Sequence, residues 1–344
     1  MSVSNSRGVT YASAGVDITE IAKIHNQIDS ILSRTFRTRR GKIGQPLNVH
    51  QHYAGLIKIN QDRVLALHAD GVGTKVLVAS ACKKYDTIGI DCVAMNVNDI
   101  ICVGAEPLAL VNYLALDRPQ PHLVKQIMLG LQQGARMAGV AIVSGETAIM
   151  PDVIRGFDLA ATVVGIVNRK DIITGEECEE GDIILGLKSS GIHSNGLTLA
   201  RKVLLNSRTR PEILTELLRP TRIYVREVLK IKRSKIEIHG LAHITGGAYS
   251  KLKRIGDRAK VGFNLNALPQ PHRIFRTIQK RGGISDREMY RTFNMGIGFL
   301  IICPKRFAHK IAKIIPDAKL IGHVTRSRDV IARVKGHDIQ IEKW

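Results

Sequence analysis

The sequence predicts an α/β or α+β protein with two domains. Strand-like apolar runs alternate with helix-like amphipathic segments in both halves of the chain. The length of 344 residues exceeds that of one ordinary domain, and a hydrophobic fraction of 44% is enough for two substantial cores. The sequence turns polar at residues 168–174, so we expect an N-terminal domain at residues 1–168 and a C-terminal domain at residues 169–344.

The first half is expected to contain four strands and three helices. Uninterrupted apolar runs predict strands at residues 64–69, 108–116, 140–143 and 159–167. Apolar periodicity predicts helices at residues 75–84, 91–103 and 123–139. The glycines at positions 104 and 139 mark the ends of the second and third helices.

The second half repeats this alternation. Strands are predicted at residues 181–187, 238–244, 296–302 and 318–324. Helices are predicted at residues 197–205, 249–255 and 307–315. A polar turn follows each of the first two strands, which is where the ligands of layered α/β proteins commonly bind.

Composition limits the class of protein. The five cysteines include no C-x-x-C pair, which argues against a disulfide framework or a zinc site. The chain has no run of about 20 apolar residues, and its N-terminus has no signal-peptide pattern. We therefore expect a cytoplasmic protein that does not span a membrane.

The net charge of +21 comes from 51 basic and 30 acidic residues. Such a charge attracts polyanions, including nucleic acid. The basic residues are spread along the chain, however, and they form no strip interleaved with aromatic residues. We expect small anionic substrates as partners and consider nucleic-acid binding the less favoured alternative.

The turn Asp70-Gly-Val-Gly-Thr-Lys75 joins a predicted strand to a predicted helix. Glycines allow backbone N–H groups to approach a polyphosphate, and a lysine supplies a positive charge for it. The acid can hold the accompanying hard cation. We therefore predict phosphate binding by Asp70, Gly71, Gly73, Thr74 and Lys75, the alternative being a plain strand-to-helix connection.

Carboxylates on the next helix are candidate metal ligands. Asp91 and Asp99 are eight residues apart, which on one helix is about 12 Å along the axis and too far to share one ion. Either several ions bind or Asp91 only caps the helix. Asp99, next to Asn98 and among apolar neighbours, is the better ligand candidate because an unpaired carboxylate there would be costly.

Three further polar turns are candidate binding loops. Gly145, Glu146 and Thr147 are expected just after a buried strand. The second turn places Ser190, His193, Ser194 and Asn195 before a helix, where hydroxyl and N–H groups bind anions. The third contains Thr245, Gly246 and Gly247. Each could instead be an ordinary turn, and a single histidine is usually structural.

With these residues identified, the chain resembles the phosphoribosylformylglycinamidine cyclo-ligase family, also called aminoimidazole ribonucleotide synthetases. The resemblance runs nearly end to end. The matching blocks are Tyr11-Ala-Ser-Ala-Gly-Val-Asp17-Ile, Asp70–Lys75, Asp86–Asp91, Asn98-Asp99 with Gly104–Pro107, Gly145–Thr147 with Met150-Pro151, Ser189–Gly196, Pro220–Val225, His243–Gly247 and Met289–Gly296. The Pro220–Val225 and Met289–Gly296 blocks are the ones specific to the cyclo-ligase.

The resemblance implies a fold, a reaction and roles for residues. It implies an N-terminal domain whose sheet pairs across a homodimer, a C-terminal α/β domain and a cleft between them. ATP, with Mg²⁺, would phosphorylate the formyl oxygen of formylglycinamidine ribonucleotide. An amidine nitrogen would then close the imidazole ring, giving aminoimidazole ribonucleotide in purine biosynthesis.

The resemblance also assigns roles within that reaction. Asp70, Asp99 and Asn98 would hold Mg²⁺, with Asp91 as a further candidate. Asp99, Lys75 and His193 would be catalytic, His193 through proton movement or oxyanion stabilisation. The remaining candidates would bind ATP (Gly71, Gly73, Thr74, Gly145, Glu146, Thr147) or the second substrate (Ser190, Ser194, Asn195, Thr245, Gly246, Gly247).

Some positions depart from the family pattern, and other ATP-using enzymes remain as rivals. The family's glycine-rich loop after the first helix is reduced to Gly41-Lys42-Ile-Gly44 and then Gly55. In a separate turn, the family's triple glycine near position 247 ends in Ala248. A selenophosphate-type enzyme would carry a reactive cysteine near the N-terminus, whereas the first cysteine is Cys82. A hydrogenase-maturation dehydratase would end in cysteine, and this chain ends in Glu-Lys-Trp. A thiamine-monophosphate kinase is a further rival.

Overall fold

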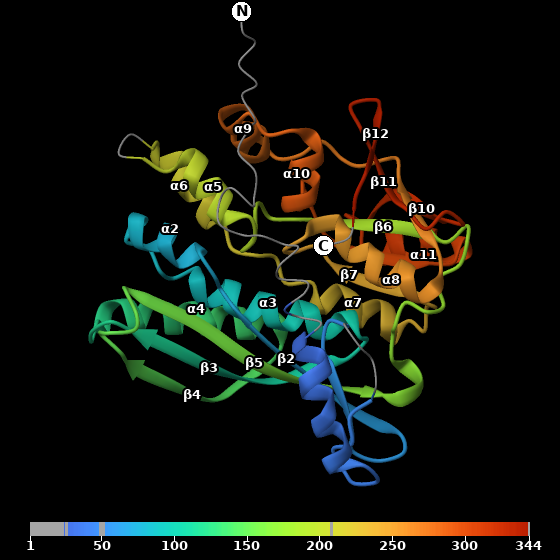
Figure 1. Cartoon of the computed structure of the whole chain (residues 1–344), viewed down its shortest axis with the longest axis horizontal. Helices are drawn as coiled ribbons and strands as arrows, with labels where there is room; N and C mark the ends of the chain where they lie inside the picture. The colour runs from blue at the N-terminus through green and yellow to red at the C-terminus, as the bar shows by residue number, and fades with distance from the viewer. Residues whose placement is uncertain (1–23, 25–26, 48–51, 207–208, 343–344) are drawn as a thin grey trace, which may run out of the picture.

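The computed structural model describes residues 24, 27–47, 52–206 and 209–342. The Tyr11–Ile18 block lies outside the described residues. Two sheets divide the described chain: the strands of the first lie between Gly55 and Asn168, and those of the second between Ile183 and Gln340 (Figure 1). The predicted α/β or α+β fold, with strands and helices in both halves of the chain, is confirmed.

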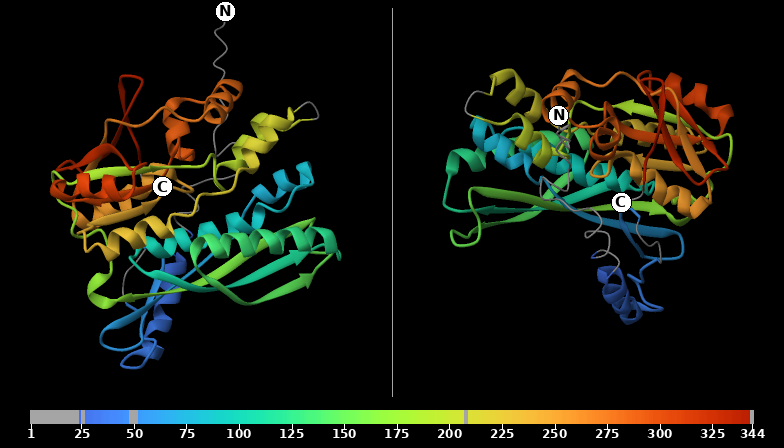
Figure 2. Two further views of the ribbon diagram at one scale, coloured as in Figure 1. Left: turned by 180° about the vertical axis from the view of Figure 1, so that it is seen from behind. Right: turned by 45° about the horizontal axis from the view of Figure 1, so that its top comes forward.

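The first sheet has the order β1-β2-β5-β3-β4 and is antiparallel except for the β3–β4 pair. Its strands are β1 (Gly55–Lys58), β2 (Arg63–Gly71), β3 (Glu106–Leu116), β4 (Ala141–Ile149) and β5 (Phe157–Asn168). The helices of this half are η1 (Ser33–Arg39), α2 (Lys75–Cys82), α3 (Ile88–Cys102) and α4 (Pro121–Ala138). Helices α3 and α4 lie on one face of the sheet and leave its other face open (Figures 1 and 2).

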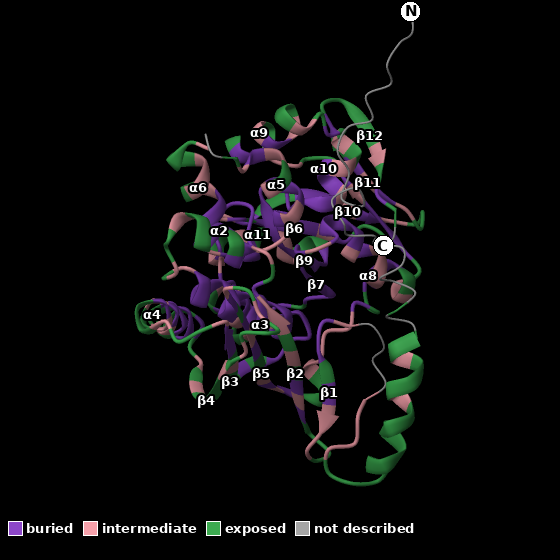
Figure 3. Cartoon of the chain, turned by 60° about the vertical axis from the view of Figure 1, so that its left-hand side comes forward, coloured by how far each residue is buried: buried purple, intermediate pink, exposed green. Residues whose placement is uncertain are grey.

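Helix α3 is the central element of the molecule. All of its residues are buried, because the first sheet lies on one side of it and the second domain on the other (Figure 3). It packs closely on α4: a Cβ on Gly89 would lie 2.1 Å from the backbone nitrogen of Leu131. The polar side chains of α3 are therefore held inside the protein, where each needs a partner.

The second sheet has the order β12-β11-β8-β10-β6-β9-β7 and is antiparallel except for β8–β11. Its strands are β6 (Ile183–Lys188), β7 (Gly240–His243), β8 (Gly262–Leu265), β9 (Ile297–Cys303), β10 (Lys319–Thr325), β11 (Val330–Val334) and β12 (His337–Gln340). The helices are η2 (Arg169–Asp171), α5 (Leu197–Leu204), α6 (Pro211–Leu218), α7 (Val225–Arg233), η3 (Ala248–Lys251), α8 (Leu252–Ala259), α9 (Arg273–Gly282), α10 (Asp286–Thr292) and α11 (Lys305–Ile314).

The structure corrects several predicted element boundaries. Strand β4 continues to Ile149, so Glu146 and Thr147 lie within a strand and not in a turn after it. Strand β4 is an edge strand whose side chains are mostly exposed, so it lacks the apolar pattern of a buried strand. The predicted helix at residues 249–255 is a 3-10 turn followed by α8. Eight elements have no predicted counterpart: β1, β8, β11, β12, α6, α7, α9 and α10.

Candidate active site

A cavity of ≈ 250 Å³ lies where the two domains meet. The end of β2 and the following turn form one wall, and the segment that opens α5 forms the other. Its lining residues are Asp70, Gly71, Val72, Gly73, Thr74, Met95, Ser194, Asn195, Gly196, Leu197 and Thr198. The structure thus brings the predicted phosphate turn and the predicted substrate loop to one cavity.

Two helices begin at this cavity, one from each domain. Helix α2 starts at Lys75 after Thr74, and α5 starts at Leu197 after Gly196. The hydroxyl oxygens of Thr74 and Thr198 are 3.2 Å apart, which places the two N-termini side by side. Free N–H groups and the positive ends of two helix dipoles favour an anion between them.

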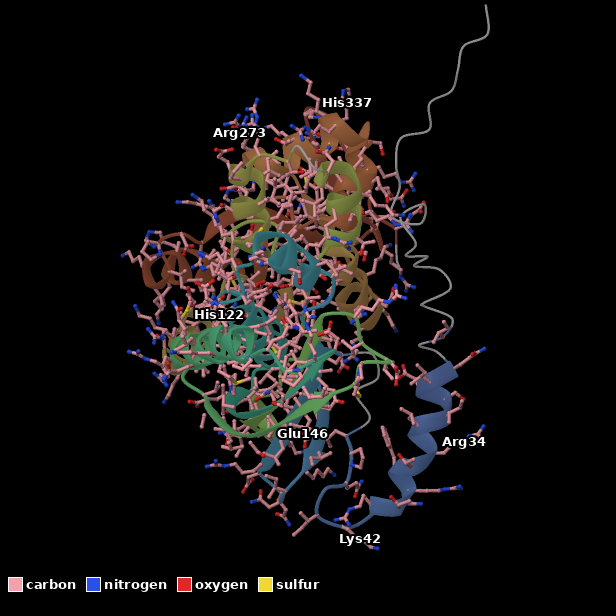
Figure 4. All side chains as sticks on the ribbon, turned by 90° about the vertical axis from the view of Figure 1, so that its left-hand side faces the viewer. Arg34, Lys42, His122, Glu146, Arg273 and His337 are labelled. Atoms are coloured by element: carbon pink, nitrogen blue, oxygen red, sulfur yellow. The ribbon has the colours of Figure 1, made fainter. Side chains whose placement is uncertain are left out.

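A larger hollow of ≈ 730 Å³ opens on the uncovered face of the first sheet. It shares Asp70 and Gly71 with the smaller cavity, and its floor contains the small residues Ala69, Ala160 and Ala161. Gly145 and Glu146 line it as well, and Figure 4 labels Glu146 on this sheet. Thr147 does not line either space, and the side chain of Glu146 accepts its backbone N–H at 2.9 Å.

Asp70 is held in place from α3. The side-chain oxygen of Asn96 accepts the backbone N–H of Asp70 at 3.1 Å, and its amide nitrogen donates to the carbonyl of Asp70 at 3.1 Å. Burial and the negative charge of Asp99 raise the pKa of Asp70. The two predicted metal ligands Asp70 and Asp99 therefore lie close enough for their charges to repel.

Asp99 lies among cationic and imidazole groups. Its Oδ1 is 2.7 Å from Nδ1 of His243, and its Oδ2 is 3.5 Å from Nε2 of His68. Burial alone would raise the pKa of Asp99, but Lys251, His243 and His68 outweigh burial and lower it to about 2. Asp99 is therefore ionised at neutral pH, and the hydrogen bond assigns the proton of His243 to Nδ1.

Two further residues, His68 and Lys251, contribute to the surroundings of Asp99 and were not among the predicted site residues. His68 is two residues before Asp70 in β2, so both side chains point to the face covered by α3. Lys251 ends the 3-10 turn after Gly246-Gly247, and burial lowers its pKa. The alternation of β2 was the one available signal for His68, and no local pattern pointed to Lys251.

The side chain of Asn98 bonds to residues of the second domain. Its side-chain oxygen accepts the backbone N–H of Tyr224 at 2.9 Å. Its amide nitrogen donates to the carbonyl of Arg222 at 2.8 Å and lies 3.3 Å from Nε2 of His243. Because these bonds hold the second domain against α3, the structure places Asn98 at the domain junction and not at a metal.

Lys75 and Asp91 form an ion pair with no exposed surface. The Nζ atom of Lys75 is 2.8 Å from Oδ1 and 2.7 Å from Oδ2 of Asp91. Burial lowers the pKa of Lys75, and Asp91 opposes that effect. The expectations that Lys75 grips a phosphate and that Asp91 binds a metal are not supported by this geometry. Asp91 is not the helix cap either, since Thr87 is the N-cap of α3.

His193 shapes the second loop from inside. It is fully buried with a left-handed backbone (φ 63°), and its Nε2 accepts the backbone N–H of Ser190 at 3.2 Å. Burial and nearby basic groups hold the pKa of His193 well below its ordinary value. The ring does not line the cavity, so proton movement by His193 has no route to a ligand there.

The other residues of this loop are fixed by the Pro220 segment and by Asn294, which lies just after α10. The hydroxyl of Ser190 donates to the carbonyl of Pro220 at 2.6 Å. The amide of Asn294 donates to the carbonyls of Gly191 and Ile192 at 2.9 and 3.3 Å. Of the predicted substrate residues, Ser194 and Asn195 line the cavity.

The third turn lies outside both spaces. Thr245 is buried and accepts the backbone N–H of Ala248 through its carbonyl at 2.7 Å. Gly247 and Ala248 both have left-handed backbones, with φ of 82° and 43°. The turn therefore keeps the glycine-type conformation at Ala248 and leads directly into Lys251 beside Asp99.

Comparisons with known proteins identify the family. The chain matches the N-terminal domain of AIR synthase related proteins at residues 51–167 and their C-terminal domain at residues 179–335. The chain is 50% identical to phosphoribosylformylglycinamidine cyclo-ligase of Pyrococcus horikoshii over 97% of this chain and 100% of that protein. It is 49% identical to that of Methanocaldococcus jannaschii over 94% of each chain.

A solved structure supports the fold. The structure of the hydrogenase maturation protein HypE in complex with ATP superimposes with a TM-score of 0.62, at 19% identity, over 81% of this chain and 85% of that one. At that identity the likeness shows the shared fold alone. Within the described residues, no helix is long and apolar enough to cross a membrane. On the identity to its archaeal relatives over nearly the whole chain, the protein belongs to the phosphoribosylformylglycinamidine cyclo-ligase family and is a ligase.

Proposed function

We propose that the chain carries out the reaction of its family at the cavity between the domains. ATP phosphorylates the formyl oxygen of formylglycinamidine ribonucleotide, and an amidine nitrogen attacks the activated carbon. Phosphate leaves, the imidazole ring closes, and ADP and aminoimidazole ribonucleotide are released. High identity to cyclo-ligases over nearly the whole chain supports this reaction.

One observation supports placing the reaction in the cavity between the domains. The N-termini of α2 and α5, which belong to different domains, begin at the same cavity of ≈ 250 Å³. Two such helix starts stabilise negative charge on a phosphoryl group passing between substrates. A phosphate bound there would contact the Gly71–Thr74 turn on one side and Ser194 to Thr198 on the other.

The hollow on the open sheet face is the proposed place for the nucleoside of ATP. Its floor of Ala69, Ala160 and Ala161 admits a flat ring, and Asn112 and Glu146 supply polar groups at the wall. Because Asp70 and Gly71 line both spaces, the triphosphate would run from this hollow to the helix starts. The HypE complex, which shares the fold, contains ATP.

The proposed cofactor Mg²⁺ fits two of its four predicted ligands. Burial and the charge of Asp99 raise the pKa of Asp70, so the two carboxylates lie within electrostatic range of each other. A hard cation would relieve that repulsion and neutralise developing phosphate charge. Asn98 and Asp91 already have their side-chain atoms in hydrogen bonds and an ion pair. Asp99 would use Oδ2, since Oδ1 accepts the proton of His243.

The proposed assembly is a homodimer formed through the open face of the first sheet. This face carries exposed apolar side chains on β2, β3 and β4: Leu67, Val111, Tyr113 and Val143. Val111 and Tyr113 also line the hollow proposed for the nucleoside, which would then lie beside the dimer interface. A continuous exposed apolar face of this kind is typical of an interaction site. A cytoplasmic location and the absence of nucleic-acid binding stay predictions.

The placement can be tested with matched aspartate variants. Asp70→Asn keeps the shape of the side chain but removes its charge, and we expect kcat to fall roughly 100-fold. The control is Asp62→Asn, an exposed position just before the same strand, for which we expect unchanged kcat and KM. Unchanged kcat in a folded Asp70→Asn enzyme would remove Asp70 from the site.

A further inference from the structure

The ammonium group of Lys75 has no exposed surface from which it could reach a ligand. Its Nζ lies 2.8 and 2.7 Å from the two oxygens of Asp91 and donates to the carbonyl of Arg219 at 2.7 Å. Oδ2 of Asp91 is an ion-pair contact without a hydrogen bond, so the ammonium group donates to one carboxylate oxygen and one carbonyl oxygen, both inside the protein. Lys75 is also fully buried, so its charge is directed into the protein although it opens α2.

The carboxylate of Asp91 accepts hydrogen bonds from residues of both domains. Its Oδ1 accepts the hydroxyl of Ser194 at 3.1 Å, and the backbone N–H and hydroxyl of Thr221 at 2.7 and 2.6 Å. Ser194 and Thr221 belong to the second domain, and Lys75 and Asp91 to the first. One buried carboxylate therefore ties the start of α2 to the loop that leads into α5.

We propose that Lys75 and Asp91 are positioning residues that set the distance between the two helix starts. The proposal rests on the placement of the reaction in the cavity between those helices. Lys75 fixes the start of α2 at Asp91, and Ser194 fixes the loop before α5 at the same carboxylate. Lys75 acts through this tie and does not contact a phosphate.

The buried contacts around Asp91 are expected to be destabilised strongly when only one charge of the Lys75–Asp91 pair is removed. Removing Lys75 alone leaves the carboxylate of Asp91 buried without a counter-ion, which costs far more than removing both charges. Asparagine at position 91 would still accept from Thr221 through its side-chain oxygen. The single and double variants should therefore differ strongly in activity.

The test is a double-variant cycle in the cyclisation assay. We expect Lys75→Met to lower kcat roughly 100-fold with KM for ATP changed less than threefold. Lys75→Met combined with Asp91→Asn should regain at least tenfold in kcat. A rise of tenfold or more in KM for ATP that the second substitution does not reverse would overturn the proposal in favour of a phosphate contact.

If Lys75→Met does not fold, a variant of the second domain, Thr221→Val, still tests the proposal. Thr221→Val removes one hydroxyl donor to Asp91 and keeps both charges, and we expect kcat to fall about tenfold with KM for ATP unchanged. The control is Thr292→Val, at a buried threonine whose hydroxyl has no hydrogen-bond partner among the described residues. Wild-type kcat in folded Thr221→Val, with only thermal stability lowered, would show a purely structural role and overturn the proposal.

The same experiment separates failure of this inference from failure of the proposed function. Absence of turnover by the wild-type protein would contradict the function. If the wild type is active, two measurements are made on the wild type, the two single variants and the double variant. Their unfolding free energies give the Lys75–Asp91 coupling independently of activity. Their kcat values give the effect of that coupling on the reaction in the cavity. Additive losses of kcat from the two substitutions would contradict the positioning role.

Discussion

Nδ1 of His243 donates to Oδ1 of Asp99 at 2.7 Å, which joins β7 of the second domain to α3 of the first. The imidazole is fully buried, and burial lowers the pKa of His243 although Asp99 opposes that shift. A neutral histidine therefore donates to an ionised carboxylate, and burial together with the charge of that carboxylate raises the pKa of Asp70. This relation connects the domain junction to the proposed metal site.

Asp99→Asn is expected to abolish turnover and leave the fold intact. Asparagine keeps the oxygen that accepts from His243 but loses the negative charge proposed to hold Mg²⁺. We predict a fall in kcat of at least 100-fold, with an unchanged far-UV circular dichroism spectrum. Near-normal kcat in this variant would remove Asp99 from the catalytic machinery.

Gly298→Ala should disrupt the support beneath the second loop. A Cβ at this position of β9 would lie 2.1 Å from the hydroxyl of Tyr224 and 2.6 Å from Cε1 of His193. Overpacking of this kind costs about 1–3 kcal/mol of unfolding free energy. Denaturant unfolding measures the effect, and Gly55→Ala is the control, because its nearest contact would be 3.8 Å. Equal stability of the two variants would contradict the described packing.

His239 should make stability depend on pH. Its Nδ1 is 2.7 Å from Asp182 and its Nε2 is 3.1 Å from Glu237. Burial lowers the pKa of His239, but the two carboxylates outweigh burial and raise it. A raised pKa in the folded state stabilises the protein below the unfolded value of about 6.5, and this contribution is lost as pH rises through the folded value.

The expected result is a pH-dependent difference between His239→Gln and wild type. The variant should lose on the order of 1–2 kcal/mol of unfolding free energy at pH 5.5 and clearly less at pH 9. Urea unfolding at both pH values gives the difference, and His309→Gln on the exposed side of α11 is the control. A larger loss at pH 9 than at pH 5.5 would contradict the assignment.

Val143→Glu should weaken the proposed dimer. Val143 is 65% exposed on β4 of the open sheet face, so a charge there would be buried against a second copy. Light scattering after size exclusion should give the mass of a single chain for Val143→Glu. The control, Leu320→Glu, changes a 56% exposed residue on β10 of the second sheet and should remain a dimer. A dimer that tolerates Val143→Glu would place the interface elsewhere.

The sequence pattern predicts the elements that are buried on a regular face. Helix α3, strand β3 and helix α4 lie within three residues of their expected limits, because their apolar periodicity reports burial. Strand β4 departs because an exposed edge strand with Ser144-Gly145-Glu146 carries no such signal.

The site was predictable where function depends on local backbone chemistry. The turn after β2 does line the cavity, as its glycines indicate. The inward direction of Lys75 was not predictable, because its partner Asp91 is 16 residues away and no local spacing rule joins the two. The same applies to Lys251 and Asp99, which only the packing of the two domains brings together.

The most direct test of the central claim is to measure ADP and aminoimidazole ribonucleotide in the same reaction mixture. Purified protein is incubated with ATP, Mg²⁺ and formylglycinamidine ribonucleotide, and the aminoimidazole is read by diazo coupling. The proposed mechanism predicts equal amounts of both products and no ADP when formylglycinamidine ribonucleotide is omitted. ADP release without that substrate, or substrate-dependent ADP without aminoimidazole, would contradict it.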